Sequence, residues 1–304
     1  MSRDLSPREL DHGLPDLADL RPSDRESREV VSDKRSATSR TGGHAPERFS
    51  RDRLAEIRFA GGRALMSRQG SSYHLNESEI RTIIELGKFR VISRHDLAQH
   101  GYGGKRERAD RDLENLIRQR LARRGVFEGP QASPRELLTL TKTGRELLQT
   151  NELVSQGQPV YAGFARPREA NHDADLYRLY QKEAARIEEQ GGRNLRVILE
   201  YELKGKIRRD IARLGAAAQK EIAAWHGLRV VENRIPVPDL RIEYETRDGE
   251  LARADLELVT EHYRGRVAAD KTRAGFSLYT PHGEAGRLRR VLGARGMRPD
   301  ILSL

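Results

Sequence analysis

The chain has 304 residues, 36% of them hydrophobic and 34% charged, and its 56 Lys and Arg outnumber its 46 Asp and Glu. The net charge of +10 indicates a polyanionic partner, most often nucleic acid; the alternative is a ribosome-like or merely basic soluble protein. The lack of cysteine excludes disulfides, thiolate metal sites and cysteine nucleophiles, and without a long apolar run or a signal peptide we expect a cytoplasmic protein with no membrane contact.

Composition divides the chain into a polar leader, two folded blocks and a linker. Residues 1–50 are rich in Arg, Asp, Ser and Pro, so we expect a disordered basic tail, which either grips phosphates or is simply solvated. Residues 51–74 are expected to form a linker or lead-in helix. The folded blocks then cover 75–152 and 171–304. Gly and Pro cluster between them, which predicts a flexible interdomain linker over 153–170.

The first block begins with two helix start signals. Asn76 is followed three residues later by Glu79, which is a capping-box pattern, and Asp96 follows Ser93 at the same spacing. A longer helix is expected within "GGKRERADRDLENLIRQRLARRG", after a turn that contains two glycines. The apolar residues of this helix recur at three and four positions, which predicts one buried stripe.

Basic side chains line the other side of this long helix. Arg108, Arg111 and Arg118 recur on a face that the apolar stripe does not occupy. The residues that we expect to contact DNA are Lys105, Arg106, Arg108, Arg111 and Arg118. The alternative is that these side chains only solvate the helix and pair with its own acids. Those acids are Glu107, Asp110, Asp112 and Glu114.

The end of the first block contains "VFEGPQASPRELLTLT", two short β-prone pieces around a Gly-Pro turn, and then "TKTGRELLQT", which begins another helix. Helix, helix, long basic helix, β-wing and helix is the element order of winged helix-turn-helix domains, and the block resembles that family. The resemblance implies that the basic helix enters the major groove of double-stranded DNA, where arginine can donate two hydrogen bonds to guanine. Winged helices also serve as protein-docking modules, which is the alternative.

The second block mixes helices and strands. A helix is expected within "HDADLYRLYQKEAARIEEQGG", and a strand is expected over 195–203. An amphipathic helix over 204–227 follows, with Trp225 on its apolar stripe. A β-hairpin over 237–259 comes next, and a further helix begins near Arg266.

The hairpin "VPDLRIEYETRDGELARADLELV" has two candidate registers. A two-residue turn would set apolar groups beside acids, whereas a three-residue loop ending at Gly249 pairs Leu240 with Leu256. We expect the second register, with Gly249 in the left-handed conformation, because it separates apolar from charged side chains. That register gathers three acids on one face of the sheet, namely Asp239, Asp255 and Glu257.

These three acids need a positive partner. Like charges that lie so close repel one another unless a cation lies among them. A divalent cation with oxygen ligands would supply the charge. The side chains of Arg241 and Lys271 would supply it equally well.

The same segments resemble a known nuclease core. "PD", a β-turn and a second strand with two acids look like the PD-(D/E)xK nucleases. More narrowly, "HDADLY", "LEYELK", "IPVPDLRI", "ADLELVT" and "DKTRAGFSLY" are similar to the replication-relaxation family of plasmids and integrative elements. That resemblance covers most of 75–280. It implies an α+β chain with a winged helix-turn-helix domain ahead of an α/β restriction-endonuclease-like domain.

The resemblance also assigns a site. The candidate catalytic residues are Asp239, Asp255, Glu257, Lys271 and Glu202, with Glu200 as an alternative to Glu202. Asp239 and Asp255 would be the metal ligands, and the cofactor of an active site would be Mg²⁺, which acidifies a bound water and stabilises the phosphate transition state. Glu257 stands where an active nuclease has its lysine, and Lys271 is the displaced substitute. A degenerate site would need no cofactor.

Three functions follow from these resemblances. The first is a DNA-binding protein of a mobile genetic element, which is accessory to plasmid or element replication or transfer, or is a regulator. The second is a Mg²⁺-dependent DNA endonuclease or nickase. The third is a protein-interaction adaptor. The expected partners are double-stranded DNA and, through the family, a relaxase or replication proteins; winged helices are often homodimers, although no heptad pattern indicates one here.

Overall fold

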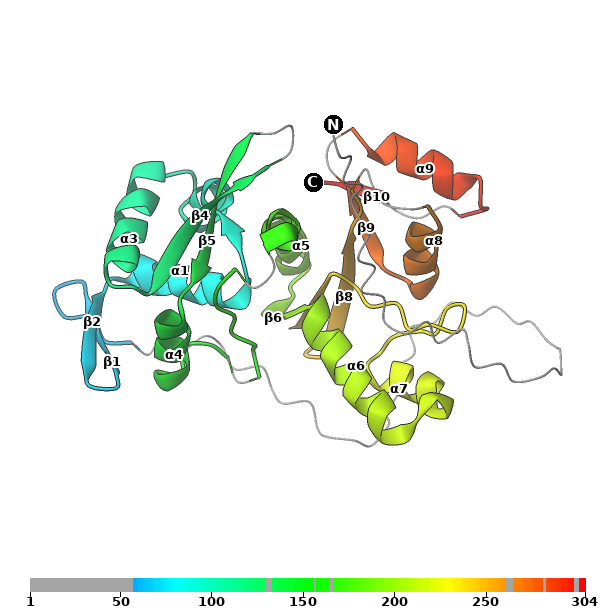
Figure 1. Cartoon of the computed structure of the whole chain (residues 1–304), viewed down its shortest axis with the longest axis horizontal. Coiled ribbons are helices and arrows are strands. Elements are labelled where there is room, and N and C mark those ends of the chain that lie inside the picture. Colours follow the sequence, from blue (N-terminus) through cyan, green and yellow to red (C-terminus); the bar gives the residue numbers. More distant parts are fainter. Residues whose placement is uncertain are drawn as a thin grey trace, which may run out of the picture.

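The protein is a mixed α+β structure. The computed structural model describes residues 57–129, 133–155, 157–164, 167–260, 265–280, 283–297 and 301–304. The predicted disordered tail, residues 1–50, lies outside these ranges. None of the helices within them is long and apolar enough to cross a membrane. Two groups of elements lie side by side, with one long helix between them (Figure 1).

The first described elements form a β-hairpin. β1 (Ala64–Arg68) pairs antiparallel with β2 (Ser71–Leu75) across a turn in which Gly70 has a φ of +78°. The lead-in helix predicted over 51–74 is therefore wrong for the part of that range that is described. The reason is visible in the burial of β1, which alternates between inward and outward side chains as a strand requires.

The helices of the first group begin where their capping residues predict. The elements are α1 (Glu77–Lys88), β3 (Ile92–Ser93), α2 (Arg94–Asp96), which continues as a π-helical turn over Leu97–Gly101, and α3 (Arg106–Arg118). Asn76 and Glu79 form both hydrogen bonds of the capping box. The hydroxyl of Ser93 accepts a hydrogen bond from the Asp96 N–H, so both predicted starts are confirmed.

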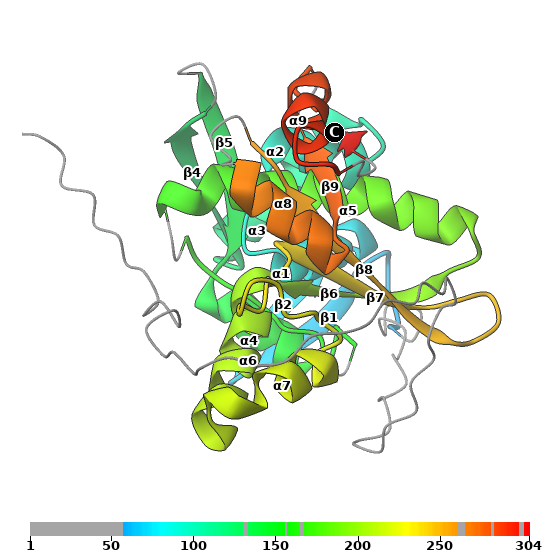
Figure 2. The ribbon, with the colours of Figure 1, turned by 90° about the vertical axis from the view of Figure 1, so that its right-hand side faces the viewer.

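A small antiparallel sheet completes the first group. β4 (Ala122–Glu128) and β5 (Pro134–Leu140) form a hairpin, and α4 (Lys142–Thr150) follows it. The strand order is β3-β5-β4, so the short strand that follows α1 pairs with the second strand of the hairpin. The far end of this hairpin projects from the body of the molecule (Figures 1 and 2).

The second group is built on a five-stranded sheet in the order β10-β9-β8-β7-β6. Its elements are α5 (Ala170–Glu189), β6 (Arg193–Leu199), α6 (Glu200–Leu214), α7 (Gln219–Trp225), β7 (Leu240–Glu245), β8 (Leu251–Leu258), α8 (Gly265–Ala274), β9 (Ser277–Thr280), α9 (Ala285–Gly293) and β10 (Ile301–Ser303). Strands β6, β7 and β8 are antiparallel, whereas β8, β9 and β10 run parallel, with α8 crossing from β8 to β9.

Two predicted elements have different bounds. The strand expected over 195–203 ends at Leu199, because Glu200 begins α6, whose first turns gain ion pairs between residues four apart. The helix expected over 204–227 breaks at Gly215, which has a φ of +82°. Trp225, predicted on an apolar stripe, is 57% exposed.

The predicted register of the hairpin is confirmed. Leu240 pairs with Leu256 and Arg241 pairs with Asp255. Gly249 has a φ of +80°, which is the left-handed conformation that the loop needs. The apolar and charged side chains of β7 and β8 therefore lie on opposite faces of the sheet.

The two groups share one hydrophobic core. Helix α5 contacts β3 on one side and β6 and β7 on the other. Phe89, which follows α1, packs against Tyr177 and Tyr180 of α5, with ring centroids 5.1 Å apart in each case. A single cluster of buried side chains extends from Ala64 to Tyr279. The groups are therefore packed together rather than free to move apart.

The segment predicted as a flexible linker helps to join the groups. The Gln158 side chain donates a hydrogen bond to the Val197 carbonyl (2.9 Å) and accepts one from the Val197 N–H (3.0 Å). Val197 lies in β6, which is the edge of the five-stranded sheet, so Gln158 satisfies backbone groups that would otherwise be unpaired. In its described part the predicted linker is thus a packed connection. The cluster of Gly and Pro within it marked a break in periodicity and not an absence of packing.

Replacing Gln158 with Ala should lower the free energy of unfolding by about 2–4 kcal/mol, because two buried backbone groups are left without their partner. Urea denaturation measures the change. Gln149→Ala at an exposed position of α4 is the matched control and should change stability by less than about 0.5 kcal/mol. Equal effects of the two substitutions would contradict the role of Gln158.

Candidate functional sites: the carboxylates of the sheet and the basic helix

Asp239 and Glu257 meet at the start of β7. Asp239 is 8% exposed and Glu257 is 1% exposed. The Asp239 N–H donates a hydrogen bond to the Glu257 carboxylate (3.2 Å), and the Asp239 carboxylate accepts one from the Leu258 N–H (2.9 Å). The register of β7 and β8 thus brings two of the predicted acids into one buried place.

Lys271 reaches the same place from α8. Its Nζ lies 2.7 Å from the Glu257 Oε1 and donates a hydrogen bond to the Val237 carbonyl, also at 2.7 Å. The amine therefore lies beside Glu257, the residue that the resemblance predicts at the position of the nuclease lysine. Because the Lys271 side chain is largely buried, its charge compensates that of Glu257 with little screening by water.

Asp255 has a different partner. Arg241 donates two parallel hydrogen bonds to its carboxylate, at 2.6 and 2.9 Å, and a third to the His226 carbonyl at 2.6 Å. Arg241 is 3% exposed, so this is a buried, doubly hydrogen-bonded pair. Of the two partners expected for the acids, basic side chains are the ones that contact them here.

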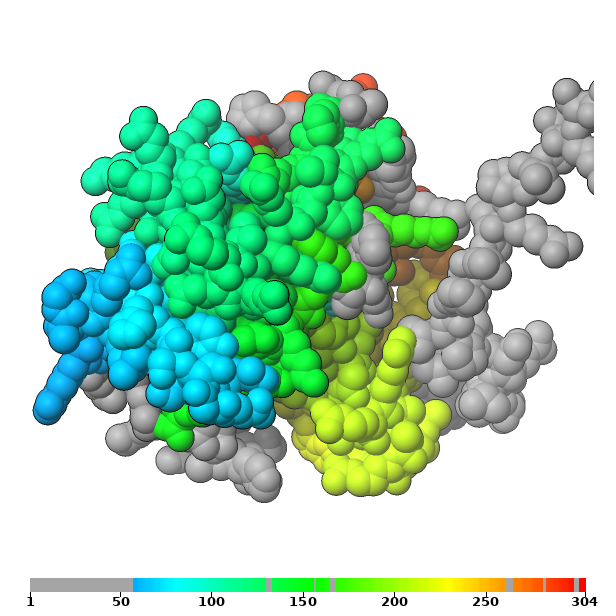
Figure 3. Space-filling view, turned by 60° about the vertical axis from the view of Figure 1, so that its left-hand side comes forward, coloured from blue at the N-terminus to red at the C-terminus, as the bar shows by residue number. Residues whose placement is uncertain are grey.

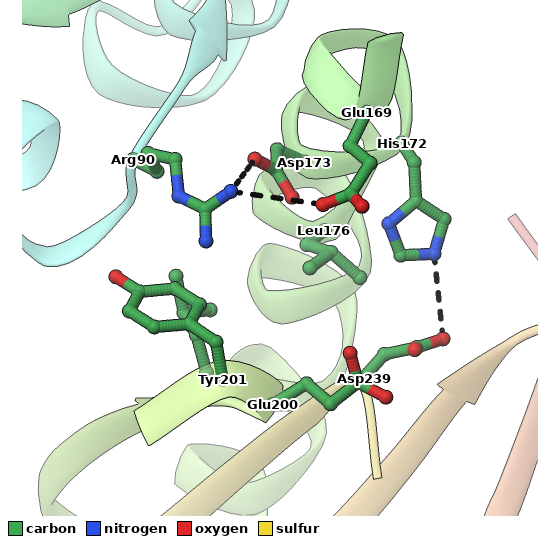
Figure 4. Close-up of a pocket in the computed structure, with 9 residues that line it drawn as sticks. Arg90, Glu169, His172, Asp173, Leu176, Glu200, Tyr201 and Asp239 are labelled. Carbon is green, nitrogen blue, oxygen red and sulfur yellow. Dashed lines mark hydrogen bonds and ion pairs between the residues drawn. The ribbon is translucent and has the colours of Figure 1, made fainter. Parts of the chain in front are cut away.

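His172, which no sequence pattern singled out by itself, lies against Asp239. Its Nε2 is 3.4 Å from the Asp239 Oδ2 (Figure 4). Partial burial acts to lower the pKa of His172, but the hydrogen bond and the charge of Asp239 outweigh it and raise the pKa to about 9. Burial acts to raise the pKa of Asp239, and the His172 and Lys271 cations hold it below its usual value. The only sequence signal was the "HDADLY" motif.

A pocket of about 230 Å³ lies beside this pair, between the two groups of elements (Figure 4). Arg90 enters it from the segment after α1, with its Nη1 2.9 Å from the Asp173 carboxylate. Its guanidinium also lies 4.1 Å from the centre of the Tyr201 ring. His172 and Asp239 line the other side. The pocket therefore holds cations and carboxylates that already contact one another.

Glu202 does not belong with the other acids. Its carboxylate accepts a hydrogen bond from the Tyr161 hydroxyl (3.0 Å) and lies 2.8 Å from the Lys206 Nζ. Glu200, the alternative, lines the pocket with Asp239. Both residues were predicted on one strand, whereas they lie in the first turn of α6. In the described ranges no three His, Asp or Glu side chains are grouped to hold a metal ion.

The basic helix α3 presents its charges to solvent. All five residues predicted to contact DNA are exposed, namely Lys105, Arg106, Arg108, Arg111 and Arg118. The acids of α3 are engaged elsewhere or face outward. Asp110 forms an ion pair with Arg94 at 2.7 Å, and Asp112 accepts a hydrogen bond from Asn76 at 3.3 Å. The pairing of these arginines with the helix's own acids, which was the alternative, is not found within the described ranges.

The positive charge of this face is therefore not neutralised locally. Arg108 makes one hydrogen bond, to the Ser78 hydroxyl at 3.2 Å. The other four cations make no ion pair with any described residue. Figure 3 views the molecule from this side, where the side chains of α3 stand out into solvent. An exposed, unpaired row of guanidinium groups is suited to bind phosphates.

Comparison with known proteins adds no identification. No protein family, no curated protein and no solved structure matches the chain.

The contact between His172 and Asp239 makes stability depend on pH in the alkaline range. The pKa of His172 is about 9 when folded against an ordinary value of 6.5, so its contribution is complete below pH 6.5 and disappears as the pH rises through 9. We expect the stability difference between wild type and His172→Gln to shrink over this interval in urea denaturation. A difference that stays constant from pH 6 to about 10 would contradict the ion pair.

Proposed function

We propose that this protein binds double-stranded DNA through α3 and the β4–β5 hairpin, and that its second group of elements is a nuclease-type scaffold that binds without cutting. By the similarity of its motifs to the replication-relaxation family, we propose that it serves the replication, transfer or regulation of a plasmid or other mobile element. The proposed binding of DNA rests on the geometry of the described residues. The proposed role in a mobile element rests on the motifs alone.

The arrangement of the first group supports a winged helix-turn-helix. Helices α1, α2 and α3 precede a hairpin whose second strand also pairs with β3. The turn before α3 contains Gly103 and Gly104 with φ of +58° and +80°. In such domains the third helix lies in the major groove while the hairpin lies along the neighbouring backbone. Here these would be α3 and the projecting β4–β5 hairpin.

One observation carries the proposal: the cations of α3 are exposed and lack acidic partners among the described residues. A row of paired charges would gain little from a phosphate, because binding would first have to break the pairs. Unpaired arginines exchange only water and counterions for phosphate, and the release of DNA counterions drives the association. The net charge of +10 agrees with such a partner.

The second group supports a PD-(D/E)xK-type scaffold. The elements follow the order α5, β6, α6, α7, β7, β8, α8, β9. Asp239 comes directly before β7, and β8 contains two acids, Asp255 and Glu257. Lys271 supplies the amine from α8, at the place expected for a displaced lysine. These features support the family resemblance in position and residue type.

The charges of this scaffold favour binding over catalysis. A Mg²⁺ ion needs carboxylate oxygens with free lone pairs. Arg241 donates hydrogen bonds to both carboxylate oxygens of Asp255, and Lys271 forms an ion pair with Glu257. A metal ion would have to displace buried protein cations that are already bonded, so the residues as arranged do not fit such a site. We therefore propose no metal-dependent step.

Removing the α3 charges should weaken duplex binding. We expect weaker binding to duplex DNA at low salt, measured by fluorescence anisotropy, from a variant with four substitutions in α3. These replace Arg106, Arg108, Arg111 and Arg118 with Ala. The variant's slope of log K against log[salt] should be shallower by roughly 0.9 for each phosphate that it no longer neutralises. The matched control replaces four exposed arginines of the second group, namely Arg247, Arg287, Arg290 and Arg295. Equal weakening in both variants would mean that only the total charge matters, and binding that salt does not affect would favour a protein-interaction adaptor.

The wild-type protein should not nick supercoiled plasmid in the presence of Mg²⁺. Agarose electrophoresis separates the nicked and linear products from the starting form. A product that appears with wild type and disappears with Asp239→Asn, while far-UV circular dichroism shows that the variant is folded, would establish the endonuclease instead. Glu257→Gln provides a second variant for the same comparison.

A further inference from the structure

The chain's single tryptophan, Trp225, is an exposed side chain that the proposed function does not use. It lies at the end of α7 and is 57% exposed. Helices α6 and α7 are inserted between β6 and β7 and stand at the lower edge of the molecule, away from α3 (Figure 1). In Figure 3 the same segment forms a separate projection, in yellow-green. The indole is thus exposed to solvent on the projection that α6 and α7 form.

The inward face of α7 is already filled. Ile222 and Ala223 are 0% and 1% exposed and pack in a cluster with Leu203 and Ile207 of α6. Trp225 therefore has no place in this core. A single exposed apolar residue is common in proteins and needs no explanation by itself. Its surroundings decide whether it forms part of a site.

Arginines gather around the residues that directly follow Trp225. The Arg253 guanidinium packs directly on the backbone of Gly227, two residues after the indole. Arg241 donates a hydrogen bond to the carbonyl of His226. Burial lowers the pKa of Arg253, and the like charges of Arg241 and Arg229 lower it further, whereas the charges of Asp255 and Glu243 oppose this shift. Three guanidinium groups are therefore crowded around the end of α7.

Two of these arginines form no ion pair with a described residue. Asp255 is held by Arg241, and Glu243, opposite Arg253 in the ladder, lies 3.4 Å from Arg196. Neither Arg229 nor Arg253 has an ion-pair partner among the described residues. The nearest acid on α7 itself is Glu221, one turn before Trp225. The surface therefore combines an exposed aromatic face with unpaired positive charge.

We propose that Trp225, Arg229 and Arg253 form a second DNA contact, which binds an unpaired strand. The indole stacks on a base and the two guanidinium groups bind the adjacent phosphates. We expect no such stacking on a duplex, because its bases are already stacked on one another and their faces are not available to the indole. The contact uses none of the residues of α3, so it stands or fails separately from the duplex site.

The intrinsic fluorescence of the protein tests this contact directly, because Trp225 is the only tryptophan. We expect an oligothymidylate to quench the emission of the full chain saturably, and a blunt duplex of the same length to leave it nearly unchanged. The variant that lacks the four α3 arginines should keep the quenching by the single strand. This last result separates the second contact from the proposed duplex site.

Substitutions test the energetic role of the same residues. Trp225→Ala should raise the Kd for labelled oligothymidylate roughly 5- to 150-fold in anisotropy, the range expected for one stacked base. Arg229→Ala with Arg253→Ala should weaken binding and its salt dependence, whereas the control Arg247→Ala with Arg290→Ala should do neither. All three variants should keep the wild-type affinity for duplex, which shows that they are folded.

Three results would overturn the proposal. The first is emission that the single strand does not change, or an unchanged Kd for Trp225→Ala. The second is equal quenching by duplex, which would mean that the strand need not be unpaired. The third is an emission shift that depends on protein concentration without DNA, because a second copy of the chain would then cover the indole.

Discussion

The pairing of β7 with β8 in one register is the constraint on which the second half of the structure depends. It sets Leu240 against Leu256 on the face that α5 covers, and it sets Arg241 against Asp255 on the other. A slip by one residue would exchange the two faces and bury the charged side chains of β7 and β8 under α5. The same register places Asp239 beside Glu257, where Lys271 and His172 can reach them. Apolar burial thus selects the register, and the charge pairs follow from it.

Charge compensation then divides the molecule into two kinds of surface. The negative charges of Asp239, Asp255 and Glu257 are compensated inside the protein by histidine, arginine and lysine side chains. The cations of α3 and of the end of α7 have no such match within the described ranges. These cations are exposed to solvent. If the proposed DNA contacts form, they exchange water for phosphate and break no ion pair of these cations.

The packing of α5 between the two groups of elements fixes them relative to each other. Its tyrosines contact Phe89 on one side, while the same helix carries His172 toward Asp239 on the other. Gln158 ties the connecting segment to the edge of the sheet. The surfaces on α3 and α7 therefore belong to one packed body. A DNA that is duplex at one place and open at another would meet them at a fixed separation.

The sequence by itself determined what depends on near neighbours in the chain. The caps at Asn76 and Ser93, the loop at Gly249 and the basic face of α3 all follow from spacings of a few residues, and the segregation of apolar from charged positions decided the register. Tertiary structure decided the rest. The contact of His172 with Asp239 and the bonds of Gln158 to Val197 join residues far apart in sequence, which no local pattern encodes. Trp225 looked like a core residue because its helical spacing was right. The helix breaks at Gly215, and Ile222 and Ala223 of α7 occupy the core position instead of the indole.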